Sequence, residues 1–199
     1  MSALTPALRH RASRPNWEVI FAADAEGANA EDNGGFGVVM TPIEQTLWEK
    51  TLAAGCRPGF TVAKLDGSTA HLRDARKELE ARIPVSRVPH EVLSTKRFWA
   101  PIAQGRWRHR EHITLGEGRA TLVLLQRLAA MPEAHGHRHL DLCDNLPWSA
   151  ATAKGRSPAY ALNRLLQKRA ALQISSDLQL IHPWVDTHRM PADDISRQK

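Results

Sequence analysis

Cysteine is scarce in this chain, which has only Cys56 and Cys143 among its 199 residues. Two thiols cannot form a disulfide framework, and neither has the spacing to other residues that a metal ligand would show. An apolar run long enough to span a bilayer is also absent, and residues 1–14 lack the apolar segment of a secretory signal. We therefore expect an intracellular protein, cytoplasmic or nuclear, that makes no contact with a membrane.

Two further absences narrow the possible functions. A glycine-rich turn would follow the first strand of a methyltransferase nucleotide pocket, but the run 139–144 is followed by Asn-Leu-Pro-Trp at 145–148. His135, His137 and His139 have no paired cysteines and no second histidine cluster, so zinc binding is a weaker interpretation than chance composition. The sequence thus argues against a nucleotide-pocket methyltransferase and against a structural zinc site.

The composition is that of an ordinary globular protein. Hydrophobic residues make up 42% of the chain and charged residues 24%. A length of 199 residues is enough for one domain with a hydrophobic core. We predict a single domain over residues 1–199, with a basic, disordered N-terminus at 1–15. The net charge of +6 accompanies six tryptophans and favours an acidic polymer as partner. The charge alone would fit a merely basic soluble protein equally well.

Hydrophobic periodicity and turn residues divide most of the chain into strands and helices. The expected strands are residues 17–23, 34–40, 98–108, 139–144 and 177–185. The expected helices are residues 114–131, 147–153 and 158–174, followed by a short helix that starts at Pro191. Three antiparallel strands followed by alternating helices and strands predict an α/β fold, with a mixed five-stranded sheet flanked by helices.

Residues 41–93 interrupt this alternation. The segment is rich in proline, and its one clear amphipathic pattern predicts a helix over residues 69–82. We interpret 41–93 as a partly helical insertion after the second strand, lying outside the core of the sheet.

Four acidic residues occupy comparable places in the expected fold. Asp24 and Asp144 each end a strand, whereas Glu117 and Asp193 each lie near the start of a helix. The carboxyl ends of parallel strands meet at one edge of a sheet, so these side chains can converge. Four close carboxylates would repel one another unless cations held them together, and oxygen ligands suit Mg²⁺ or Mn²⁺. The set therefore predicts metal-dependent phosphodiester chemistry.

Two neighbouring acids are expected to lie outside this set. Asp194 follows Asp193 on the same helix, where consecutive side chains are turned by about 100°, so both cannot point inward. Asp141 lies three residues before Asp144, so strand alternation sends it to the opposite face of the sheet.

The four acids also stand in an ordered series of motifs. Asp24 ends a strand, His112–Ala120 reads HIxxxExRA around Glu117, and Asp144 is followed by asparagine. The series closes with Pro-Ala-Asp at 191–193 and Ser-Arg at 196–197. This order resembles the ribonuclease H-like domain of retroelement (reverse transcriptase) polyproteins. The similarity covers residues 17–24, 34–39 and 99–197, and segment 41–93 has no match.

The resemblance implies an activity and a role for each acid. It implies a metal-dependent endoribonuclease that cleaves the RNA strand of RNA–DNA hybrids with two Mg²⁺ or Mn²⁺ ions. Asp24 would touch both ions, Glu117 and Asp144 would hold the leaving-group side, and Asp193 would hold the water side. A reverse transcriptase domain in the parent polyprotein would be a partner.

Basic residues near these motifs would contact the phosphates of the nucleic acid without reading its sequence. They are Arg106, Arg108, Arg110, Lys154 and Arg156.

Two departures from the family pattern keep a second interpretation open. Glu26 replaces a small hydroxylated residue two positions after Asp24. Gly116 replaces an aliphatic residue before Glu117, which we expect to weaken the start of that helix. The alternative is a catalytically inactive nucleic-acid-binding or structural remnant of a retroelement polyprotein. Convergence of the carboxylates within metal-bridging distance would separate the two interpretations.

Overall fold

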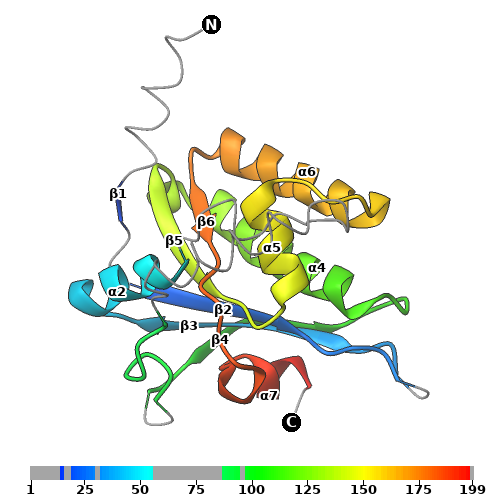
Figure 1. Ribbon diagram of the computed structural model, residues 1–199, viewed down its shortest axis with the longest axis horizontal. Coiled ribbons are helices and arrows are strands. Elements are labelled where there is room, and N and C mark those ends of the chain that lie inside the picture. The colour runs from blue at the N-terminus through cyan, green and yellow to red at the C-terminus, as the bar shows by residue number, and fades with distance from the viewer. Residues whose placement is uncertain (1–13, 16–18, 30–31, 56–86, 95–96, 198–199) are drawn as a thin grey trace, which may run out of the picture.

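The computed structural model describes residues 14–15, 19–29, 32–55, 87–94 and 97–197. A mixed sheet runs through the molecule and helices pack against both of its faces (Figure 1). The strands are β1 (Arg14–Pro15), β2 (Val19–Ala25), β3 (Gly35–Pro42), β4 (Ala100–Arg106), β5 (His137–Leu142) and β6 (Gln179–Ile181). The helices are α2 (Gln45–Gly55), α4 (Ile113–Ala129), α5 (Leu146–Lys154), α6 (Tyr160–Ser175) and α7 (Asp193–Ser196), with 3₁₀ turns η3 (Pro132–Ala134) and η4 (Thr187–Arg189).

The strand pairing confirms the predicted fold class. β2, β3 and β4 form an antiparallel meander, while β5 lies parallel to β2 and β6 lies parallel to β5. Arg138 of β5 pairs with both Pro15 of β1 and Gln179 of β6, so β1 and β6 use opposite edges of β5. β1 pairs with the start of β5 and β2 with its end. The five strands β2 to β6 form the predicted mixed sheet flanked by helices. The two-residue β1 is a sixth strand, which the sequence did not predict.

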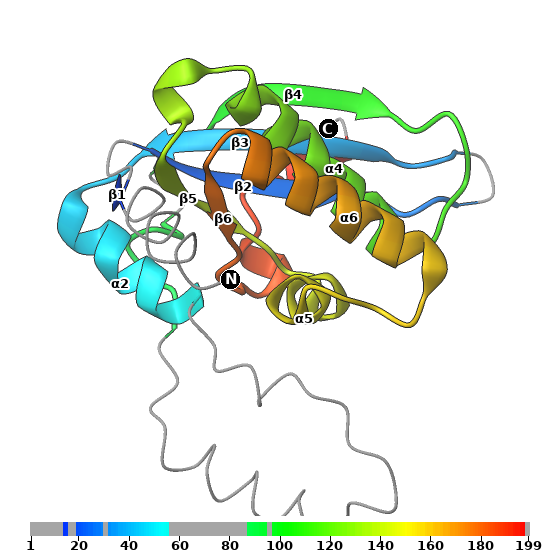
Figure 2. The ribbon, with the colours of Figure 1, turned by 90° about the horizontal axis from the view of Figure 1, so that it is seen from above.

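Side chains that alternate along the strands pack into two hydrophobic cores, one on each face of the sheet. Phe21 and Ala23 of β2 point to the face covered by α4, α5 and α6. Ile20 and Ala22 point to the other face, where Trp48 of α2 packs. Figure 2 shows α4 and α6 running side by side across the first face. Among the described residues, no helix is long and apolar enough to cross a membrane.

The interpretation of segment 41–93 as lying outside the core is wrong where the structure describes it. Trp48 is only 2% exposed, and Ile43 and Val92 are buried in the same core as the inner side chains of β2. A helix at Gln45–Gly55, which the sequence pattern did not predict, supplies this packing. The helix predicted over residues 69–82 lies outside the described residues, so the insertion itself stays a prediction.

Two smaller expectations also change. Residues 14–15 were predicted to belong to a disordered N-terminus, but they form β1, while residues 1–13 lie outside the described part of the chain. α6 starts two residues later than predicted, with Ala159 as its N-cap.

Candidate active site

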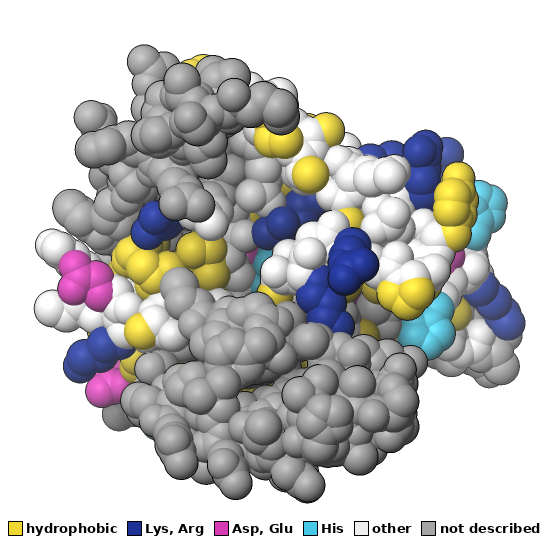
Figure 3. All heavy atoms as spheres, turned by 45° about the horizontal axis from the view of Figure 1, so that its top comes forward, with side chains coloured by type: hydrophobic (Ala, Val, Ile, Leu, Met, Phe, Trp, Pro, Cys, Tyr) yellow, Lys and Arg dark blue, Asp and Glu magenta, His cyan; other side chains and the backbone are white. Residues whose placement is uncertain are grey.

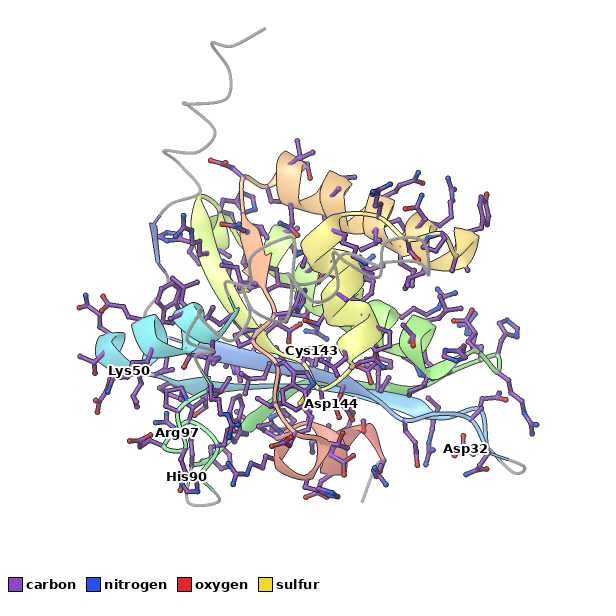
Figure 4. All side chains as sticks on the ribbon, in the orientation of Figure 1. Asp32, Lys50, His90, Arg97, Cys143 and Asp144 are labelled. Atoms are coloured by element: carbon purple, nitrogen blue, oxygen red, sulfur yellow. The ribbon has the colours of Figure 1, made fainter. Side chains whose placement is uncertain are left out.

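Three of the four predicted carboxylates meet at one edge of the sheet. Asp24 is the penultimate residue of β2, Glu117 lies in α4, and Asp144 comes two residues after β5. One carboxylate oxygen of each lies within 4.8 Å of the others. Asp24 and Glu117 are only 4% and 3% exposed, whereas Asp144 is half-buried. In Figure 4, Asp144 lies between the end of β5 and α7.

The strand register explains why Asp24 and Asp144 meet. Phe21 of β2 is opposite Asp141 of β5, and Ala22 is opposite Leu142. Continuing this parallel register by two residues brings Asp24 level with Asp144. Both acids therefore follow from the rule that parallel strands deliver their carboxyl ends to a common edge.

Glycines on either side of Glu117 let α4 bring this residue close to the sheet. A Cβ on Gly116 would lie 3.2 Å from the Cβ of Ala25, and one on Gly118 would lie 3.0 Å from the ring of Trp148. Larger side chains at these positions would push the helix away from β2 and α5. Gly116, which we expected only to weaken the helix, thus has a packing reason of its own.

The three carboxylates share a buried and electrostatically unfavourable environment. Burial first, and then the neighbouring carboxylates of Asp144 and Asp193, raise the pKa of Asp24 to about 7 against the opposing hydrogen bond from Ser196. Burial, with Asp24 and Asp144 nearby, also holds the pKa of Glu117 well above its usual value. Burial raises the pKa of Asp144 too. A bound cation would relieve both the desolvation and the mutual repulsion.

Asp193, the fourth predicted ligand, lies beside the cluster and is not part of the group of three. Its Oδ1 accepts hydrogen bonds from Nε and Nη2 of Arg197 at 2.8 and 2.7 Å. Its charge is nonetheless close enough to raise the pKa values of Asp24 and Asp144. Asp194 is exposed to solvent.

Asp141 is not part of the group of three, although its charge is close enough to raise the pKa of Glu117. It is fully buried, and its Oδ2 lies 3.2 Å from Nδ1 of His182, the residue after β6. This contact therefore links β5 to the residue that follows β6.

Sequence reasoning missed two hydroxyl groups that serve the carboxylates. Ser196 of α7 donates a buried hydrogen bond of 2.6 Å from Oγ to Oδ2 of Asp24. A hydrogen bond from the Thr187 side chain lowers the pKa of Asp144, against the effect of burial. Ser196 stood in the closing motif, but nothing in that motif indicated which acid its hydroxyl would reach.

The five predicted nucleic-acid-binding residues fall into two places. Arg106, Arg108 and Arg110 lie at and after the end of β4, and Lys154 and Arg156 lie at and after the end of α5; all five are exposed. Arg106 already forms ion pairs with Asp32 and Glu26 of the β2–β3 hairpin. On the face drawn in Figure 3, dark-blue lysine and arginine side chains are more prominent than acidic ones.

An open pocket of about 340 Å³ lies between the end of β4 and α4. The rings of Phe36 and Trp107 have centroids 4.7 Å apart in its wall. Its other lining residues are polar or charged: Arg106, Arg108, His109, Glu111 and Arg119. Glu111 and Arg119 bind each other, with 2.6 Å between Oε1 and Nη2. The pocket thus combines aromatic surface with an excess of positive charge.

No protein-family model matches the chain, and no curated protein matches it either. Among solved structures, the chain is similar to the N-terminal RNase H domain of a Mycobacterium tuberculosis protein, determined as a fusion with maltose-binding protein. The two are 13% identical with a TM-score of 0.46, over 90% of this chain and 91% of that one. A likeness this weak assigns neither a family nor an activity, so the function has to be argued from the site itself.

Proposed function

We propose that the chain is a metal-dependent nuclease of the ribonuclease H type, derived from a retroelement polyprotein, which cleaves the RNA strand of RNA–DNA hybrids. The observation that carries the proposal is the convergence of Asp24, Glu117 and Asp144 within 4.8 Å at one sheet edge. Among the described residues, Asp24 and Glu117 form no ion pair with a basic side chain, and buried acids of this kind destabilise a fold unless a cation offsets their charge. The motif order supports the family, and a reverse transcriptase domain of the same polyprotein is the partner it suggests.

The donor set fits hard divalent cations. All three groups are carboxylates, and oxygen ligands favour Mg²⁺ or Mn²⁺ over zinc or copper. The three groups act on one another, because Asp24 and Asp144 both raise the pKa of Glu117 and Asp144 raises that of Asp24. Two bound ions would activate a water molecule and neutralise the leaving oxygen of the phosphodiester. Asp24, Glu117 and Asp144 would hold them, and Asp193 would join from α7.

The substrate would reach this edge across the basic surface beside it. Arg108 and Arg110 lie between β4 and α4. Lys154 is the last residue of α5, the helix that comes after Asp144, and Arg156 follows that helix. Such side chains bind phosphates of any sequence and make binding sensitive to salt. The aromatic wall formed by Phe36 and Trp107 offers an apolar surface next to these charges.

One observation favours the second candidate, a catalytically inactive nucleic-acid-binding or structural remnant. Asp193 is neutralised by Arg197, and the pKa of Arg197 is raised in turn by Asp193, Asp24 and Glu26. A guanidinium group in this place supplies part of the positive charge that a second ion would otherwise bring. A remnant could keep the fold stable in this way without metal.

Cleavage of a labelled RNA–DNA hybrid with and without Mg²⁺ tests the proposal. We expect metal-dependent cleavage of the RNA strand, with duplex DNA left intact. Asp144→Asn should reduce turnover by at least about 100-fold, because one ligand and one charge are lost at nearly constant volume. Asp194→Asn, a change at an exposed acid of α7, should cleave like the wild type. No metal-dependent cleavage at high protein concentration would favour the inactive remnant.

A further inference from the structure

The last helix, α7, is seated directly on the backbone of β3. A Cβ on Gly37 would lie 2.6 Å from the backbone nitrogen of Ser196, and a Cβ on Gly35 would lie 2.7 Å from its carbonyl oxygen. Neither position therefore has room for a side chain while α7 stays in place. Ala192, directly before the helix, is fully buried in the second core and anchors it there. The position of Ser196 is thus fixed by packing on both sides.

This seating places the Ser196 hydroxyl against Asp24. Ser196 is fully buried, and its Oγ lies 2.6 Å from Oδ2 of Asp24 and 2.9 Å from the carbonyl oxygen of Asp193. A serine hydroxyl has one hydrogen and can donate to one of these acceptors at a time. The carboxylate is the nearer acceptor and is charged when ionised, so it forms the stronger bond.

We propose that Ser196 is a positioning residue for the metal site, whose hydroxyl fixes the Asp24 carboxylate so that its remaining lone pairs face Glu117 and Asp144. This inference rests on the proposed metal-dependent function. It assigns to the Ser196 hydroxyl the orientation of Asp24, one of the proposed metal ligands. Groups that orient metal ligands by hydrogen bonding change metal affinity although they never touch the ion.

A neutral donor suits this task better than a cation would. A lysine or arginine at position 196 would also stabilise ionised Asp24, but its charge would compete with the metal for the carboxylate. A hydroxyl donates one hydrogen bond, carries no charge and leaves the carboxylate free to bind cations. Arg197, which directly follows α7, forms its ion pair with Asp193.

Mn²⁺ binding by the full chain, measured by isothermal titration calorimetry without nucleic acid, tests the inference. Ser196→Ala should bind Mn²⁺ about tenfold more weakly than the wild type, which corresponds to about 1.4 kcal/mol. Ser176→Ala is the matched control, since Ser176 is also buried but lies at the end of α6. Ser196→Cys fills nearly the same space with a weak donor and should lose affinity as Ser196→Ala does; it serves if the alanine variant does not fold.

The outcomes separate this inference from the function it rests on. Weaker Mn²⁺ binding by both Ser196 variants, with unchanged binding by Ser176→Ala, supports the positioning role. Wild-type affinity in either folded Ser196 variant overturns it and leaves the metal site in place. Absence of Mn²⁺ binding by the wild-type chain overturns the metal-dependent function, and the inference with it.

Discussion

Replacing Asp24 by asparagine should stabilise the metal-free protein at neutral and alkaline pH. Asp24 is 4% exposed, and burial raises its pKa from 3.8 to about 7. Ionising it in the folded protein therefore costs free energy that the unfolded chain does not pay. Asparagine has nearly the same volume, carries no charge, and keeps an oxygen that can accept the hydrogen bond from Ser196. It mimics the protonated acid at every pH.

The size of the effect follows from the two pKa values. Between pH 3.8 and about 7 the folded protein holds a proton on Asp24 that the unfolded chain has lost, so stability falls as pH rises through this window. A pKa difference of one between the folded and unfolded states is equivalent to about 1.36 kcal/mol of stability. The difference of about 3 for Asp24 therefore amounts to about 4 kcal/mol at most. The gain from Asp24→Asn should grow from about 2 kcal/mol at about pH 5.5 to about 4 kcal/mol at about pH 8.

Urea denaturation in the presence of a chelator measures this gain at both pH values. The informative quantity is the difference between pH values, because it cancels any change in packing that asparagine introduces. Asp194→Asn is the control, since this exposed acid of α7 should leave the wild-type pH dependence unchanged. If the stability of Asp24→Asn relative to the wild type does not increase between about pH 5.5 and about pH 8, then Asp24 is not held in a charge-unfavourable site and the case for a cation there fails.

Three further changes test the second core, the substrate surface and the seating of α7. Trp48→Ala should lower the free energy of unfolding by about 3–5 kcal/mol, whereas Leu146→Ala, at a half-exposed residue, should cost far less; similar losses for both would remove α2 from the core. Arg108→Ala should weaken hybrid binding for all sequences and reduce the slope of log affinity against log salt concentration by about 1, as measured by fluorescence anisotropy; an unchanged slope would place Arg108 outside the interface. Gly37→Ala should cost about 1–3 kcal/mol, because its Cβ would lie 2.6 Å from the nitrogen of Ser196; a wild-type melting temperature would contradict the tight seating of α7 on β3.

The strand positions could be predicted because each strand carries its own pattern. Apolar runs bounded by glycine, proline and acidic residues located β2, β3 and β5 to within a few residues. The parallel pairing of β2 with β5 then brought Asp24 and Asp144 to one edge, as the order of elements indicated. Glu117 could be added because α4 has a strong helical pattern and returns across this edge.

Elements with weak local patterns could not be predicted in the same way. α2 has only Trp48, Thr51 and Ala54 as buried residues, and two of these three are small or polar. β6 was expected to extend over residues 177–185 but is limited to Gln179–Ile181, with an isolated bridge between Cys143 and Trp184 beyond it. In both cases, packing against the rest of the fold decides where the element begins and ends.

The sequence by itself determined which acids stand at the strand ends and in the helix that meet at one sheet edge, since the strand ends and the helix pattern are local properties of the chain. Only the tertiary structure decided what surrounds those residues. Ser196 reaches Asp24 across 172 positions, and Arg106 is bound by Asp32 and Glu26 across 74 and 80 positions. The pairing of Asp193 with Arg197 is local, because the two residues are four positions apart. Burial and the other charge pairings depend on neighbours that are distant along the chain, so the raised pKa of Asp24 and the ion pairs of Arg106 have no local signature.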